Sequence, residues 1–277
     1  MKEYYPLLDA SGFMEQHNRM AYEIYLYDNN LAPYGTSDPA SAPTFTPMYS
    51  ASEIANPAVD NDWIDLVTRN GFINEHNLSL NGGTEATRIF ASFGFMDQET
   101  VVKDHDYRRY TGRVNMDQKI GKRINLSVNL SMSRVASTNA SYGPQDGGIE
   151  KWSMLMSARN FAPVTPIYDE DGSYAKTYNT QATNPVAFLD IDDNTWTQRF
   201  MVNPQLDIDL IRGLKFTVRG GADLNGSKRK VYIPVAVENF QTPDGMASLY
   251  SSSISNFSGE AFFTFIKELG EHRFNVV

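Results

Sequence analysis

The sequence predicts an all-β fold, an antiparallel up-and-down transmembrane β-barrel segment of about eight strands that follows a helical and coil N-terminal segment. Three observations lead to this prediction. Polar and apolar residues alternate through most of the chain after Gly71, and several alternating runs reach about ten residues or more. Short connections between these runs also alternate with long ones along the chain. Strands of this length and order are typical of a sheet that crosses a bilayer.

Composition narrows the class of protein further. The 277 residues are 41% hydrophobic, which is enough to bury a real apolar surface. The net charge of -9 and the pI near 5.0 disfavour a nucleic-acid binder, because no stripe dense in Lys and Arg is present to displace counterions. The absence of cysteine excludes disulfides and thiol catalysis. No apolar run approaches the roughly 18 residues of a membrane helix.

Residues 1–72 are predicted to be helix and coil, and residues 73–277 to be part of a barrel. Asp9 or Ser11 is a candidate N-cap for a helix in the first segment. Its apolar face would carry Phe13, His17, Met20, Ile24 and Tyr27. Four prolines between residues 32 and 50 indicate a surface linker, since each would interrupt a helix. A second short helix over 62–67 is expected to end near Gly71 in a left-handed cap.

The clearest predicted strand runs from Ile124 to Met132, where every second residue is apolar. Seven further strands are predicted over 74–81, 87–96, 107–119, 200–210, 214–224, 256–267 and 272–277. An open sheet in lipid would leave unpaired backbone groups at both edges, at several kcal/mol for each group. Because the last run is short, we expect these strands to belong to a wider, closed barrel.

The connections predict which side of a membrane each loop occupies. Short turns fall at 82–85, 120–122, 212–213 and 269–271, and longer loops at 97–106, 134–195 and 225–255. Outer-membrane barrels have short periplasmic turns and long external loops. The loops near 134–195 and 225–255 are therefore predicted to be extracellular.

A soluble, surface-anchored β-sandwich that binds glycans is the main alternative, because alternating strands build that fold too. Strand length favours the barrel, since strands of soluble proteins centre on about five or six residues. Aromatic residues near strand ends also fit a membrane girdle. They are Tyr107, Tyr110, Trp196 and Phe200.

Two sets of residues are candidates for function. Charged residues on the polar side of the strands are expected to face a hydrated lumen or a plug, since charge facing lipid is costly. They are Arg109, Arg113, Asp117, Lys215, Arg219 and Asp223. Aromatic residues in or beside the longest loop are candidates for stacking on a sugar or packing against a lid, or for packing the loop upon itself. They are Trp152, Tyr168, Tyr174, Tyr178 and Trp196.

No catalytic or metal-binding pattern stands out. The four histidines lack the spacing of a metal pair. Asp190, Asp192 and Asn194 imitate the start of a calcium loop, but Thr195 stands where the turn glycine belongs. A carboxylate pair for glycoside hydrolysis would depend on the folded distances. We therefore expect no enzyme activity, no cofactor and no metal.

Several segments in order resemble SusC/RagA-type TonB-linked outer-membrane proteins. The run NLSLNGGTEATRIFASFGF at 77–95 resembles the early barrel hairpin of that family, and YRRYTGRVNMD at 107–117 resembles the next strand. Between them stands Thr100, where the family usually has glycine. Residues 166–174 with Asn184-Pro185 resemble the long external loop. Residues 8–14 and 61–63 resemble the segment after the plug and the short helix before the barrel.

This resemblance implies a part of a transporter in the cell outer membrane. Such proteins have a barrel of about 22 strands filled by a plug. They import glycans or peptides, draw energy through the TonB complex and work with a SusD-like lipoprotein. Residues 1–72 would lie between plug and barrel, and the strands would contact outer-membrane lipid. No plug or TonB box is recognisable in the sequence, so contact with TonB is expected through other regions of a parent protein.

Overall fold

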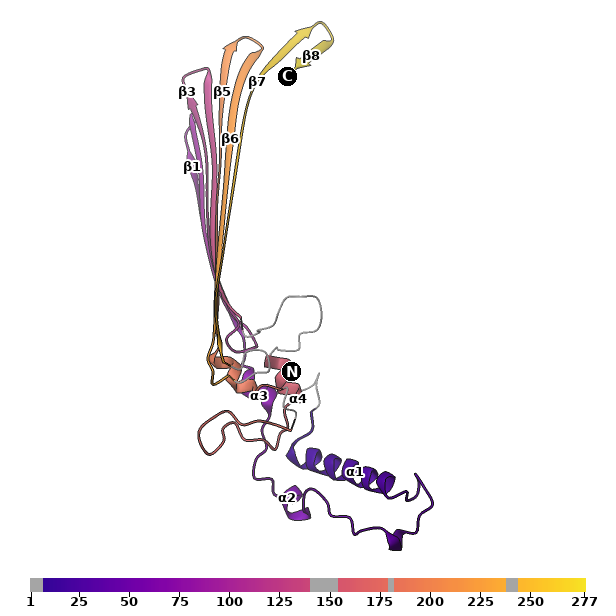
Figure 1. The fold of residues 1–277 in the computed structure, drawn as a ribbon. Helices are drawn as coiled ribbons and strands as arrows, with labels where there is room; N and C mark the ends of the chain where they lie inside the picture. Colours follow the sequence, from indigo (N-terminus) through magenta and orange to yellow (C-terminus); the bar gives the residue numbers. More distant parts are fainter. Residues whose placement is uncertain (1–6, 140–153, 179–181, 238–243) are drawn as a thin grey trace. The chain divides into compact units, whose positions relative to one another are not determined.

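The computed structural model describes residues 7–139, 154–178, 182–237 and 244–277. Its helices are α1 (Ala10–Asp28), η1 (Pro39–Ser41), α2 (Ala51–Ala55), α3 (Trp63–Val67), α4 (Met154–Asn160) and η2 (Pro185–Asp190). Its strands are β1 (Phe72–Gly83), β2 (Thr87–Glu99), β3 (Asp106–Ile120), β4 (Ile124–Thr138), β5 (Asp192–Ile211), β6 (Leu214–Ile233), β7 (Met246–Leu269) and β8 (His272–Val276). Figure 1 shows these elements along the chain.

The chain divides into two compact units. The sheet unit comprises residues 70–139, 192–232 and 247–277. The loop unit comprises residues 1–69, 140–191 and 233–246. Each unit is therefore assembled from three separate stretches of sequence.

The strands of the sheet unit form one antiparallel sheet in the order β1 to β8, so each strand pairs with the next in the chain (Figure 1). Between β3 and β4, for example, the register runs without a break from Ile120 opposite Ile124 to Tyr107 opposite Ser137. The up-and-down order confirms the predicted fold class. A sandwich needs two sheets, whereas the described residues form only this one, so the alternative fold is not found.

Most strands are longer than the alternating runs that predicted them. β5 and β6 each have 20 residues and β7 has 24. β4 continues to Thr138 and β6 to Ile233, so the connections span 139–191 and 234–245 and are shorter than the expected loops at 134–195 and 225–255. The added strand ends are rich in polar residues on both faces. Alternation therefore does not mark them, although their backbones pair.

Glycine closes three of the four short turns in a conformation that other residues rarely adopt. Gly121, Gly213 and Gly270 have φ of 63°, 85° and 61°. The first turn differs, because Gly83 still pairs within β1 and the Thr84 hydroxyl accepts the N–H of Thr87 at 3.1 Å. All four turns overlap the predicted positions, although the first two lie one or two residues later in the chain.

The helices differ from the prediction at their ends. Asp9 caps α1 by accepting the N–H of Gly12 at 2.8 Å, whereas the Ser11 hydroxyl donates to the carbonyl of Ile54. The expected left-handed cap at Gly71 is wrong, because its φ is not positive and α3 already ends at Val67. Thr68 is extended there and leads the chain directly toward β1. None of the described helices is both long and apolar enough to cross a membrane.

The buried apolar core lies almost entirely in the loop unit. Trp63 and Val67 of α3, Met154 of α4 and Val237 are at most 2% exposed. Among the described hydrophobic residues of the sheet unit, only Val231 is buried. The sheet therefore has a large apolar surface that the described residues of the sheet unit do not cover.

Candidate functional site

One face of the sheet carries a continuous apolar band. Residues that pair across antiparallel strands share a face, so the register defines rows across the sheet. Five rows across β3 to β6 consist mainly of apolar residues. The exceptions on β3 are Gln118 and Gly112, and the middle row contains Pro204 on β5 and a glycine on β6. On β4 they contain Ile124, Leu126, Val128, Leu130 and Met132, and on β5 Ile208, Leu206, Pro204, Val202 and Phe200.

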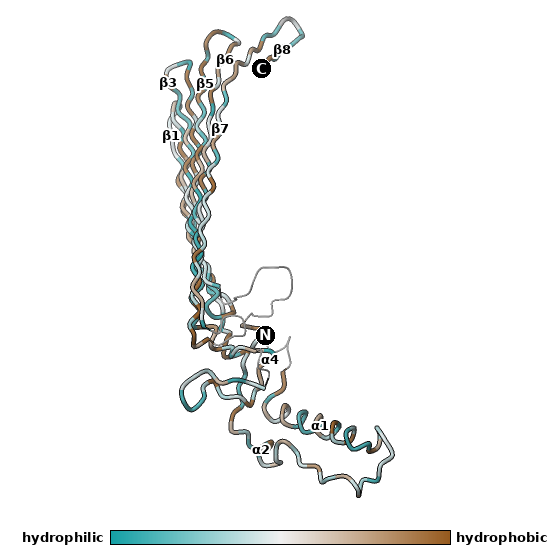
Figure 2. The backbone as a smooth tube through the Cα atoms, in the orientation of Figure 1, coloured by the Kyte–Doolittle hydropathy of each residue, from teal (hydrophilic) through white to brown (hydrophobic). Residues whose placement is uncertain are grey.

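The height of this apolar band matches a bilayer. From Ile124 to Met132 the strand advances eight residues, which at roughly 3.4 Å each gives about 27 Å along the strand. A tilt of 35–45° reduces this to about 20 Å, close to the roughly 25 Å apolar band of outer-membrane barrels. Figure 2 shows the alternation of hydropathy along the strands.

Large side chains of this face are open to the surroundings. Leu78 and Leu80 of β1 are 73% and 72% exposed, and Phe93 and Met132 are 50% and 54% exposed. Contiguous exposed apolar surface of this extent marks contact with a partner or a membrane.

The opposite face is polar and carries all six predicted lumen residues. The register aligns Asp117, Ser127, Gln205 and Arg219 in one row. It aligns Arg113, Ser131, Met201 and Asp223 in another. Arg109 shares the face from β3, and Lys215 shares it from β6 opposite Asp209. The structure thus brings these residues to one surface, although they come from two well-separated stretches of chain.

Charges on this polar face are paired with one another. Arg199 donates two hydrogen bonds to the carboxylate of Asp223, at 2.9 and 2.7 Å. Arg219 forms an ion pair with Glu260 of β7. Ser127 donates to Asp117 at 2.6 Å, and Thr217 donates to Asp207 at 2.6 Å. The result is a hydrophilic surface on which positively and negatively charged side chains alternate.

The predicted aromatic residues do not come together. Tyr168 and Tyr174 face each other across a β-bridge, with ring centroids 5.2 Å apart. The Tyr174 hydroxyl donates to Asp190 at 2.7 Å. Burial raises the pKa of Tyr174, and the hydrogen bond to Asp190 raises it further. This pair packs the loop unit upon itself.

The other aromatic residues lie elsewhere. Tyr178 contacts the Phe13 and His17 rings of α1 at 6.1 and 5.5 Å between centroids. Trp196 lies within β5, on the same face as the apolar band, and Lys230 is 5.6 Å from its ring centroid. Trp152 lies outside the described residues. The structure therefore offers no single aromatic site made from this set.

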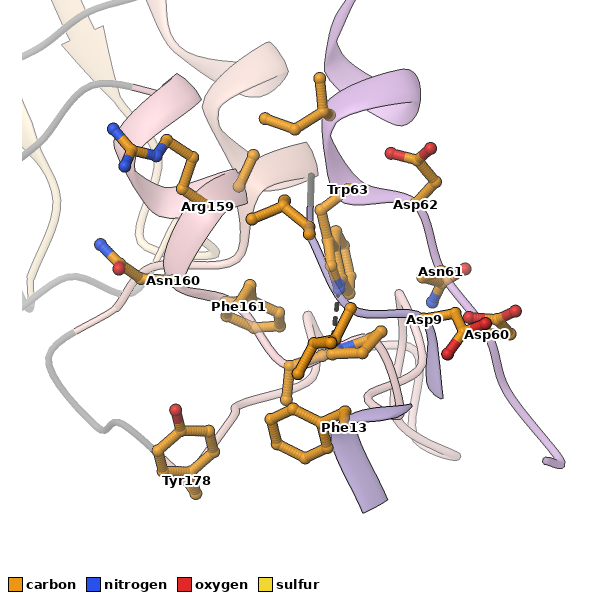
Figure 3. A pocket seen from close by; sticks show the side chains of 16 residues that line it. Asp9, Phe13, Asp60, Asn61, Asp62, Trp63, Arg159, Asn160, Phe161 and Tyr178 are labelled. Atoms are coloured by element: carbon orange, nitrogen blue, oxygen red, sulfur yellow. Dashed lines mark hydrogen bonds between the residues drawn. The ribbon is translucent and has the colours of Figure 1, made fainter. Parts of the chain in front are cut away.

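A cavity of about 680 Å³ lies within the loop unit (Figure 3). Aromatic rings line it together with carboxylates, and the Trp63 and Phe161 rings meet edge to face at 4.7 Å. Figure 3 shows Asp9, Asp60 and Asn61 grouped together, apart from Arg159. Sequence reasoning missed this cavity and did not single out Trp63 or Phe161 as site residues. The only signal was the Asn61-Asp-Trp63 motif, which indicated a helix and not a site.

Two carboxylates of this cavity accept hydrogen bonds from backbone N–H groups. Asp9 accepts from the N–H of Gly12, and Asp60 accepts from the N–H of Ala10 at 2.9 Å. In the part of the chain that the structure describes, no group of His, Asp and Glu is arranged to hold a metal ion. The cavity thus combines apolar rings with fixed polar groups, as small-molecule pockets do.

Comparison with known proteins gives a consistent result. No protein-family model matches the chain. The TonB-dependent receptor P3 of Formosa agariphila is 25% identical over 236 residues, which cover 84% of this chain and 24% of the receptor. The TonB-dependent receptor SusC of Bacteroides thetaiotaomicron is 23% identical over 236 residues, which cover 78% of this chain and 23% of SusC.

Solved structures show the same fold. The RagAB peptide importer in its closed-closed state matches with a TM-score of 0.63 at 16% identity, covering 96% of this chain and 30% of that one. The structure of the RagAB peptide transporter matches with a TM-score of 0.60 at 19% identity, covering 77% of this chain and 24% of that one.

The fold and its two faces define a section of an up-and-down transmembrane barrel. The resemblance to SusC/RagA-type TonB-linked outer-membrane proteins is confirmed, because the matched relatives are TonB-dependent receptors that include SusC. The chain spans about a quarter of the length of the curated relatives, 24% of the first and 23% of SusC.

Proposed function

We propose that this chain forms part of the wall and external loops of a TonB-dependent nutrient importer in the outer membrane, and that it catalyses no reaction. The observation that carries the proposal is the apolar band, whose large side chains stay exposed among the residues that the structure describes. Lipid is the natural solvent for such a band, and the polar face would then line a hydrated interior or contact a plug.

The order of the strands supports the assignment of the long loops to one side of the membrane. In a sheet of successive antiparallel strands, the segment before β1 and the β4–β5 and β6–β7 connections all join the same end of the strands. The loop unit consists of these three segments. Since long connections lie outside in outer-membrane barrels, we place 139–191 and 234–245 on the extracellular side. Residues 1–72 would lead from a plug to β1 through the same external layer.

The substrate class and partner follow from the relatives. We propose import of oligosaccharides or peptides, with a SusD-like lipoprotein partner and energy from the TonB complex through parts of a longer protein. The matched importer RagAB is named for peptide transport, and SusC is a TonB-dependent receptor. A polar wall with paired charges suits passage of either polar substrate.

Uptake of labelled substrates tests this function. Cells with and without the gene for the whole receptor would be given fluorescent oligosaccharides and fluorescent oligopeptides of matched size. We expect the gene to raise uptake of one class, and deletion of TonB to abolish the gain. Equal uptake with and without the gene, for both classes, would contradict the proposal.

Substitution of the candidate aromatic residues locates the substrate contact. Alanine at Trp152, Tyr168, Tyr174 or Tyr178 would be compared with Trp196→Ala in the same uptake measurement. The position of Trp196 beside the apolar band favours an interfacial role, so we expect Trp196→Ala to leave uptake of the substrate unchanged. At least one loop variant should lower uptake while the receptor stays in the membrane.

A further inference from the structure

A group of basic residues borders the apolar band on the same face of the sheet. The next three rows across β4, β5 and β6 are Arg134–Gln198–Gly226, Ala136–Trp196–Lys228 and Thr138–Asn194–Lys230. We call Arg134, Trp196, Lys228 and Lys230 the basic collar. It begins one row beyond Met132 and Phe200, where the apolar band ends.

The cations of the basic collar have no acidic residue in their own rows on β4 to β6, and Asp192 of β5 lies one row further on. None of the nine residues in the three rows is acidic. Arg134, Lys228 and Lys230 are all exposed, and none of them forms an ion pair among the described residues. Other strand arginines do pair, as Arg199 does with Asp223. An anion from outside the chain would therefore complete the collar.

A groove joins the basic collar to the apolar band. It has a volume of about 560 Å³, and Arg134 and Gln198 lie among its lining residues with Phe93, Phe200 and Leu224. Gly112 and Gly226 also line it. A Cβ at Gly112 would come within 2.9 Å of the Met132 methyl carbon, so glycine keeps this part of the groove free of a second side chain.

We propose that the basic collar and this groove bind a phosphate-bearing lipid of the surrounding leaflet, with its phosphate at Arg134, Lys228 and Lys230 and an acyl chain in the groove. The inference rests on the proposed membrane location. It goes further by assigning a lipid class to a defined site. Tryptophan prefers the interface between headgroups and hydrocarbon, which is the depth that a lipid phosphate occupies. Each basic residue near an anionic lipid surface contributes roughly a fivefold gain in binding.

Lipid retention tests the site. The whole receptor would be extracted from outer membranes in a neutral detergent, and its bound lipids would be identified by native mass spectrometry and counted by phosphorus analysis. The test variant is Arg134→Gln/Lys228→Gln/Lys230→Gln. The matched control is Arg88→Gln/Arg109→Gln/Lys119→Gln, which removes the same charge from the polar face.

We expect the test variant to bind phosphate-bearing lipid roughly a hundredfold more weakly than the wild type, since three residues each contribute about fivefold, with neutral lipid unchanged and the control variant at the wild-type level. Equal retention by the test variant would overturn the inference. So would an equal loss of neutral and phosphate-bearing lipid, or full displacement of the lipid by inorganic phosphate, which would indicate a site for the free anion.

Membrane fractionation separates the two proposals. If the wild-type receptor is recovered in the soluble fraction, the proposed function fails and the lipid site fails with it. If the receptor is in the membrane fraction but the test variant keeps its phosphate-bearing lipid, only the lipid site fails.

Discussion

The indole Nε1 of Trp63 donates a hydrogen bond of 2.9 Å to the carbonyl oxygen of Ala162, across 99 positions of sequence. Both groups are buried. Next to them, Asn61 donates from its backbone N–H to Pro163 and from its side chain to Thr165. The segment before β1 and the β4–β5 connection are therefore joined into one folded unit.

Replacing Trp63 should loosen the loop unit without unfolding the sheet. Trp63→Phe keeps a ring against Phe161 but leaves the buried carbonyl of Ala162 without its donor, at a cost of about 1–3 kcal/mol. Trp63→Ala should cost about 3–5 kcal/mol. Hydrogen exchange of the amides in 154–162 measures the effect. Trp196→Phe is the control, and an equal effect of the two phenylalanine variants would contradict this role.

Arginine substitutions should distinguish the two faces of β4. Val128→Arg places a charge in the middle of the apolar band and should destabilise the membrane-inserted protein by about 2–4 kcal/mol. Met132→Arg, at the edge of the band, should cost about 0–1 kcal/mol, and Asn129→Arg on the polar face should cost little. Reversible unfolding in lipid vesicles measures all three. Similar costs at the three positions would show that the band does not lie in lipid.

The ion pair between Arg229 and Asp193 should show strong coupling. Arg229 donates to Asp193 at 2.9 and 2.5 Å, and the Asp193 side chain is 0% exposed. Arg229→Met leaves a buried carboxylate without this partner, which should cost about 3 kcal/mol or more. Arg229→Met/Asp193→Asn should cost less than Arg229→Met alone. A double-mutant cycle of unfolding free energies checks this, and simple additivity would refute it.

Tyr174 should make stability depend on alkaline pH. Its pKa is raised in the folded chain, by burial first and by Asp190 second. A tyrosine in an unfolded chain ionises near about pH 10. The stabilisation should therefore be complete below about pH 10 and be lost as the pH rises through the folded-state pKa. Unfolding midpoints of wild type and Tyr174→Phe should converge as the pH rises, whereas parallel curves would contradict this.

The strands were predictable because their alternation is local. From Ile124 to Met132 the polarity of each residue indicates which face of the sheet it lies on. The glycines of the turns mark where one strand ends. The additional strand residues after Asn225 were not predictable, since lysine, arginine and serine there obey no alternation. Pairing with β5 keeps that segment extended, which no short window of sequence reveals.

The loop unit depends on contacts between residues far apart in the chain, so the sequence did not predict its cavity. Tyr178 illustrates this point. Its aromatic character identified it as a candidate, but its neighbours Phe13 and His17 come from α1, more than 160 positions earlier. The six residues predicted to face a lumen do share one polar face of the sheet, because a shared face follows from alternation and register alone, and their contact with a lumen stays a prediction.

Single-cysteine labelling across β4 tests the opposed lipid and water faces most directly. The chain has no cysteine, so one can be introduced at each position from Leu126 to Ser131 and labelled with an environment-sensitive fluorophore. In lipid vesicles, labels at 126, 128 and 130 should be quenched by spin-labelled lipid and protected from aqueous iodide. Labels at 127, 129 and 131 should show the reverse. Equal lipid quenching at all six positions, or lipid quenching at the odd positions alone, would contradict the proposed orientation of the sheet.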